Sequence, residues 1–100
     1  MTRISGLSSK EISKILKCIH LHMSHVKIFA FGSRVQGNPR KYSDFDVALH
    51  AGHPIDLSQL TKIKHCLSET DIPIHVDLVD YCSVSKDFKT LIDKQKIELG

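Results

Sequence analysis

Two aspartates stand two positions apart in the segment DFDVAL, residues 44–49. The segment alternates polar and apolar residues, so a strand here places Asp44 and Asp46 on one face and Phe45 on the other. Their Cα atoms would lie roughly 6.5–7 Å apart. Like charges this close repel unless a cation lies between them, and Mg²⁺ is commonly held by one or two carboxylates together with substrate phosphates. The pair therefore indicates a metal site, although two solvated acids on an exposed strand face are the commoner explanation.

A third acid strengthens the metal interpretation. Residues 74–79, IHVDLV, alternate in the same way, and Asp77 lies on the face opposite the apolar residues. If this strand is a neighbour of 44–49, all three carboxylates converge on one patch. Asp80 is the alternative third acid, but it falls on the same alternating positions as the apolar residues of the strand. It would therefore face the core or leave the sheet at the strand end. Strand parity favours Asp77.

A polar loop precedes the aspartate pair. Gly32 and Ser33 follow directly on the apolar segment 26–31, and glycine lets successive backbone N–H groups approach an anion closely. Arg34 follows, then Arg40 and Lys41, and no acid occurs between residues 27 and 43. A metal-bound polyphosphate would satisfy the carboxylates and the cations together. A polar glycine loop without a ligand is the alternative, and the loop matches neither the Walker A nor the G-x-G-x-x-G pattern.

The elements that position these residues alternate between helical and strand periodicity. Ser8 and Glu11 have the spacing of a capping box, so the first helix begins there. We expect an α/β (α+β) fold with a small mixed sheet of three to four strands and helices packed on one face. Periodicity does not settle the order of the strands. The expected elements are helix 8–23, strand 26–31, a helical turn in the loop, strand 44–49, helix 57–68, strand 74–79, helix 86–94 and a short terminal strand.

Length and composition limit the class of protein. One hundred residues, 41% of them hydrophobic and 25% charged, suit a single globular domain spanning 1–100. The net charge of +3 suits a small anionic ligand, and the lysines of the first helix are typical of a solvated face, so we do not expect nucleic-acid binding. No apolar run approaches the ~18 residues of a membrane helix, and no apolar signal region opens the chain. Three widely spaced cysteines predict reduced thiols, and hence a cytoplasmic protein.

Residues 32–46, GSRVQGNPRKYSDFD, closely resemble the GS-x₁₀-D-x-D signature of the DNA polymerase β-like nucleotidyltransferase superfamily. The form GSR-x-x-G…SD-x-D is most similar to the minimal nucleotidyltransferases, the MNT antitoxins encoded beside HEPN-domain toxins. IHVDLVDY is similar to the family's third-acid strand, and the resemblance covers nearly the whole chain. Val35-Gln36 departs from the frequent Ala-Arg. The helical second domain of larger members is missing, so we expect a partner protein to complete the acceptor site.

The resemblance implies a nucleotidyltransferase fold and a role for each matched residue. Asp44 and Asp46 would bind two Mg²⁺ ions, and Asp77 would complete the metal site and help activate the acceptor hydroxyl. Gly32 and Ser33 would hold the nucleotide phosphates, with Arg34 adjacent. A hydroxyl would attack the α-phosphorus of a nucleoside triphosphate and release pyrophosphate. In the most similar members the nucleotide is ATP and the acceptor is a tyrosine of a HEPN-type toxin, which adenylylation silences.

Two classes of function follow. The first is a Mg²⁺-dependent adenylyltransferase that acts as an antitoxin. The second is a binding module of the same fold that neutralises a partner by contact alone. Three convergent carboxylates favour the enzyme, because a contact inhibitor gains nothing from keeping them together.

Overall fold

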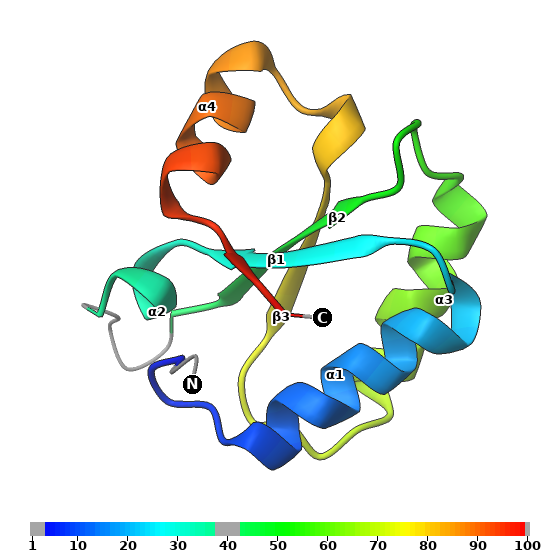
Figure 1. Cartoon of the computed structure of the whole chain (residues 1–100). Helices are drawn as coiled ribbons and strands as arrows, with labels where there is room; N and C mark the ends of the chain where they lie inside the picture. The colour runs from blue at the N-terminus through cyan, green and yellow to red at the C-terminus, as the bar shows by residue number, and fades with distance from the viewer. Residues whose placement is uncertain (1–3, 38–42, 100) are drawn as a thin grey trace.

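A four-stranded sheet with the strand order β3-β2-β1-β4 organises the protein. In this computed structural model, residues 4–37 and 43–99 are described (Figure 1). β1 pairs antiparallel with both β2 and β4, whereas β2 and β3 run parallel. The mixed sheet predicted from the sequence is confirmed. The strands are β1 (Lys27–Phe31), β2 (Phe45–His50), β3 (Val76–Asp80) and β4 (Ile97–Glu98).

The helices begin and end close to the predicted positions because their caps are local. Ser8 accepts a hydrogen bond from the Glu11 backbone N–H, and the Glu11 side chain accepts one from the Ser8 N–H, which completes the predicted capping box. Ser85 caps α4 by accepting from the Phe88 N–H. The helices are α1 (Ser9–His22), α2 (Ser33–Gln36), α3 (Leu57–Ser68) and α4 (Lys86–Gln95), with a 3₁₀ turn at Tyr81–Ser83.

The sheet carries apolar residues on both faces. Ile28 and Ala30 of β1 join the main core, which is formed with α1 and α3. Phe29 and Phe31 point the opposite way and pack with Ile92 of α4 in a second cluster. Figure 1 shows α1 and α3 on one side of the sheet and α4 on the other. The expectation that the helices pack on one face is therefore wrong for α4, because the alternating residues of β1 are apolar on both faces.

A disulfide joins Cys18 of α1 to Cys66 of α3, whose Cα atoms are 5.7 Å apart. The three cysteines were predicted to be reduced thiols, and for Cys18 and Cys66 that prediction is wrong. Each cysteine lies on the helix face that meets the other helix, and this proximity depends on how α1 and α3 pack, which spacing along the chain does not reveal.

No helix among the described residues is long and apolar enough to cross a membrane.

Candidate active site

Asp46 and Asp77 face each other on neighbouring strands. The parallel register of β2 and β3 pairs Asp46 with Asp77, Val47 with Leu78 and Phe45 with Val76. Phe45 and Val47 are completely buried in the main core, so the residues between and beside them lie on the opposite face of the sheet. Asp44 comes immediately before β2 and is two positions from Asp46, so it belongs to the same face as Asp46. The structure thus places Asp46 and Asp77 opposite each other, with Asp44, the third carboxylate predicted from strand alternation, on the same face.

Crowding of these carboxylates changes the acid–base behaviour of Asp46. Burial raises the pKa of the Asp46 carboxyl, and the negative charges of Asp77 and Asp44 raise it further. A raised pKa means that the ionised form of Asp46 is disfavoured in the folded protein. A cation placed among the carboxylates would remove this cost, so the site is electrostatically suited to a positively charged ligand.

Gly32 brings the end of β1 against the Asp46 carboxylate. An ideal Cβ on Gly32 would lie 2.3 Å from Asp46 Oδ2, and the backbone has φ +87° and ψ −164°. That region is essentially closed to residues with a Cβ, so the position requires glycine for its backbone and for the space beside Asp46. Ser33 follows as the first residue of α2. The glycine turn and the carboxylates predicted from the sequence therefore form one site.

The backbone N–H of Gly32 donates a hydrogen bond of 3.0 Å to Oε1 of Gln95, at the end of α4. The sequence predicts backbone N–H groups in this turn that can approach an anion, but the Gly32 N–H is already bonded to Gln95. Gln95 was not among the predicted site residues. A polar residue near a helix end carries no signal of such a contact, because 63 positions separate it from Gly32. Through Gln95, α4 holds the glycine turn in place.

Arg34 is buried and bonded to the backbone, with 4% of its surface exposed. Its Nε and Nη2 donate to the Ser43 carbonyl oxygen at 3.0 and 2.7 Å. Its Nη1 donates to the Ser5 carbonyl oxygen at 2.8 Å. These bonds connect α2 to the residue before Asp44 and to the N-terminal segment. Arg40 and Lys41, the other cations expected near phosphate, lie outside the described residues.

Asp80, the competing third acid, has a different environment. The residue is 9% exposed, and its side chain accepts hydrogen bonds from the Ile55 N–H at 2.8 Å, the Ser83 hydroxyl at 2.7 Å and the Cys82 N–H at 3.2 Å. These contacts hold the loop before α3 and the 3₁₀ turn after β3. Asp80 is therefore engaged in the fold, on the core side that its parity predicted.

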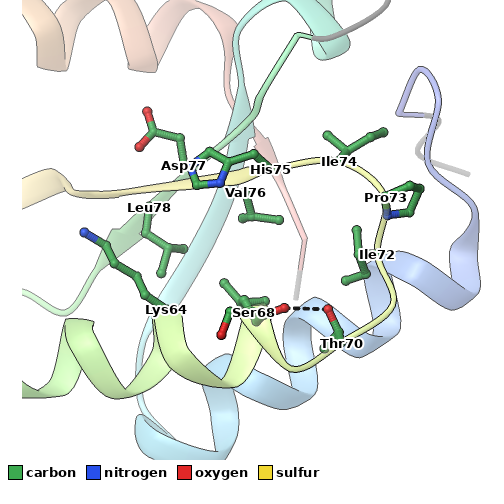
Figure 2. A pocket seen from close by; sticks show the side chains of 11 residues that line it. Lys64, Ser68, Thr70, Ile72, Pro73, Ile74, His75, Val76, Asp77 and Leu78 are labelled. Atoms are coloured by element: carbon green, nitrogen blue, oxygen red, sulfur yellow. Dashed lines mark hydrogen bonds between the residues drawn. The ribbon is translucent and has the colours of Figure 1, made fainter.

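A hollow of about 320 Å³ lies between α3 and β3 and includes Asp77 in its lining. Figure 2 shows Val76 and Leu78 pointing toward α3, whereas Asp77 points away from it. Lys64 and Ser68 of α3 line the opposite wall. The sequence did not predict this hollow, since it depends on the distance between a helix and a strand edge.

The donor set fits Mg²⁺ bound together with a phosphate. Among the described residues, no three His, Cys, Asp or Glu side chains are gathered closely enough to enclose a metal ion unaided. Mg²⁺ rarely uses such an enclosure, since it prefers oxygen ligands and takes one or two carboxylates with waters and substrate phosphates completing its coordination. Asp46 and Asp77 facing each other, with the Gly32 backbone packed against Asp46 Oδ2, match that requirement.

A mixed sheet that presents facing carboxylates beside a glycine turn is the arrangement of a nucleotidyltransferase. The chain matches the family described as "Polymerase beta, Nucleotidyltransferase" over residues 11–99, and it belongs to that family. The resemblance stated from residues 32–46 and the nucleotidyltransferase fold are confirmed.

The similar proteins include one named as a probable adenylyltransferase and two toxin–antitoxin structures. A Haemophilus influenzae protein named "Probable protein adenylyltransferase MntA" is 35% identical over 88 residues, covering 88% of this chain and 77% of that protein. A toxin–antitoxin crystal structure with AMP-PNP has a TM-score of 0.75 at 28% identity, covering 89% of this chain and 72% of that one. A tri-AMPylated Shewanella oneidensis HEPN toxin in complex with MNT antitoxin gives a TM-score of 0.67 at 26% identity, covering 89% and 68%.

Proposed function

We propose that this chain is an antitoxin that transfers AMP from ATP to a tyrosine hydroxyl of a partner HEPN-type toxin, in a Mg²⁺-dependent reaction. The observation that carries the proposal is the contact of the Gly32 turn with Asp46, whose strand partner is Asp77. This contact joins a phosphate-binding turn to a metal-binding face in one site. The relative named as an adenylyltransferase and the neighbours crystallised as toxin–antitoxin complexes support the choice of nucleotide and partner.

In this proposal Asp44, Asp46 and Asp77 hold two Mg²⁺ ions, and the turn of Gly32 and Ser33 holds the phosphates of ATP, with Ser33 as the donor because the Gly32 N–H is bonded to Gln95. The ions, when bound, stabilise the attacking and the leaving oxygen of an in-line displacement. The acceptor oxygen forms a bond to the α-phosphorus while the bond from that phosphorus to the β-bridging oxygen breaks. The acceptor proton passes to the Asp77 carboxylate, and pyrophosphate leaves.

Arg34 has a different part in this proposal from the phosphate contact that the resemblance implied. Its three hydrogen bonds go to the carbonyl oxygens of Ser43 and Ser5. Arg34 therefore acts as a positioning residue that fixes the backbone before Asp44 relative to the glycine turn. Its fixed fork of donors suits two separate acceptors at once.

A cytoplasmic location follows from ATP as the substrate. Because Cys18 and Cys66 form a disulfide, reduced thiols do not support a cytoplasmic location. The location therefore depends on the proposed reaction alone.

The contact-only binding module is the second candidate, because no three acidic or other metal-ligating side chains among the described residues enclose a metal ion. Calorimetry with Mn²⁺ and ATP separates the two. Wild type should bind nucleotide more tightly with metal present, and Asp44→Asn or Asp46→Asn should lose that metal-dependent gain while keeping the fold. Identical Mn²⁺–ATP binding in wild type and both variants would overturn the assigned site.

A further inference from the structure

The strand order places three parts of the site in a row. Gly32 follows β1, Asp46 lies on the central strand β2, and Asp77 lies on β3 at the edge of the sheet. The hollow between β3 and α3 borders the opposite face of β3, toward which Val76 and Leu78 point. The parts of the site from the glycine turn to Asp77 therefore cross one face of the sheet, and the hollow adjoins the other face of its edge strand.

The order Gly32, Asp46, Asp77 can be related to the in-line displacement at the α-phosphorus, if the proposed function holds. The attacking and leaving oxygens lie on opposite sides of the phosphorus. If pyrophosphate leaves on the side of Gly32 and Ser33, the acceptor hydroxyl must approach from the side of Asp77. β3 is the edge strand on that side, and its other face borders the hollow.

We propose that the acceptor is presented by an extended segment of the partner protein that lies along the outer edge of β3. Among residues 4–37 and 43–99, β3 pairs only with β2, so the backbone groups of its other side are available to a further strand. In an extended segment, successive side chains point to opposite faces. When the acceptor hydroxyl reaches Asp77 on one face, the residue beside it in sequence points to the other face and enters the hollow.

The walls of the hollow define which neighbouring residue fits. Val76 and Leu78 of β3 point into the space, and Leu67 and Ile72 add apolar surface. Lys64 lies at the wall formed by α3. A volume of about 320 Å³ accommodates one medium or large side chain with room for water. The residue next to the modified hydroxyl is therefore an apolar or aromatic one.

Filling the hollow tests the inference. Ser68 is an exposed α3 residue that lines the hollow, and Ser58 is an exposed serine of the same helix outside it. With the HEPN-type partner and saturating ATP and Mg²⁺, Ser68→Trp should raise the KM for the partner about tenfold or more, the loss expected when one apolar side chain is denied its buried site. The KM for ATP should stay unchanged, and Ser58→Trp should leave both constants unchanged.

A variant of the partner protein provides a second test that does not depend on the folding of this chain. Replacing the residue beside the modified hydroxyl of the partner by glycine should raise its KM with wild type and add nothing to the effect of Ser68→Trp. If wild type transfers AMP and Ser68→Trp keeps the same partner KM, or raises the KM for ATP instead, the hollow does not take the residue beside the acceptor. If wild type transfers no AMP, the proposed function fails, and the acceptor assignment fails with it.

Discussion

Replacing Gly32 with alanine tests the contact between the glycine turn and the carboxylates. The backbone conformation at φ +87° and ψ −164° would cost an alanine about 1–3 kcal/mol of stability. The new Cβ would also lie 2.3 Å from Asp46 Oδ2, roughly 1 Å closer than an ordinary C···O contact. Either the turn or the carboxylate must move by about that distance, and a misplacement of about 1 Å lowers rates about 100-fold.

Gly37 of the same loop provides the matched control. It also has a positive φ, +83°, but nothing lies within 4 Å of an ideal Cβ there. Gly37→Ala should therefore lose about 1–2 kcal/mol from its left-handed backbone alone and keep its rate of AMP transfer.

Urea unfolding of both variants, followed by initial rates of AMP transfer under conditions where each is folded, separates strain from contact. We expect both variants to be destabilised and only Gly32→Ala to lose most of its activity. Equal activity in the two variants would refute the reasoning that Gly32 positions Asp46.

Three further predictions follow from the site. Asp77→Asn should abolish transfer with little loss of stability. Asp80→Asn should destabilise the fold by about 1–3 kcal/mol, because Asp80 accepts three hydrogen bonds, and should keep its activity per folded molecule. The reverse ranking of the two activities would show that Asp80, and not Asp77, belongs to the site. Arg34→Lys should lower kcat with little change in the KM for ATP; a raised KM for ATP would show a phosphate contact instead. Because the pKa of Asp46 is raised on folding, ionisation of Asp46 opposes folding, and Asp46→Asn should raise the Tm of the metal-free protein at pH 7. This gain in Tm should vanish below about pH 4, where Asp46 is protonated in both the folded and the unfolded protein. A gain in Tm that persists below that pH would reject the electrostatic cause.

Local features of the chain predicted the carboxylate face. The side-chain period of a strand is fixed by backbone geometry, so Asp46 and Asp77 could be assigned to the polar faces of their strands from alternation alone. Parity likewise separated Asp77 from Asp80. The cap at Ser8 and the ends of α3 depend on residues within a few positions and were predicted for the same reason.

Contacts between distant segments were not predictable in this way. The Cys18–Cys66 disulfide requires α1 and α3 to pack on the same face of the sheet, and the Gln95 bond to Gly32 requires α4 to pack on the other. Arg34 illustrates a further limit. An arginine beside a phosphate-binding turn has the right charge for phosphate, but its burial and its bonds to Ser43 and Ser5 are properties of the folded chain.

Intact mass spectrometry of the HEPN-type partner tests the central claim most directly. After incubation with this protein, ATP and Mg²⁺, the partner should gain about 329 Da for each AMP transferred, because the α-phosphorus is attacked and pyrophosphate leaves. The modified partner should stay inactive after this protein is removed, and Asp44→Asn should give neither the mass gain nor the lasting inactivation. A partner that is inhibited at unchanged mass, by wild type and Asp44→Asn alike, and that recovers on separation would contradict the account and show inhibition by contact alone.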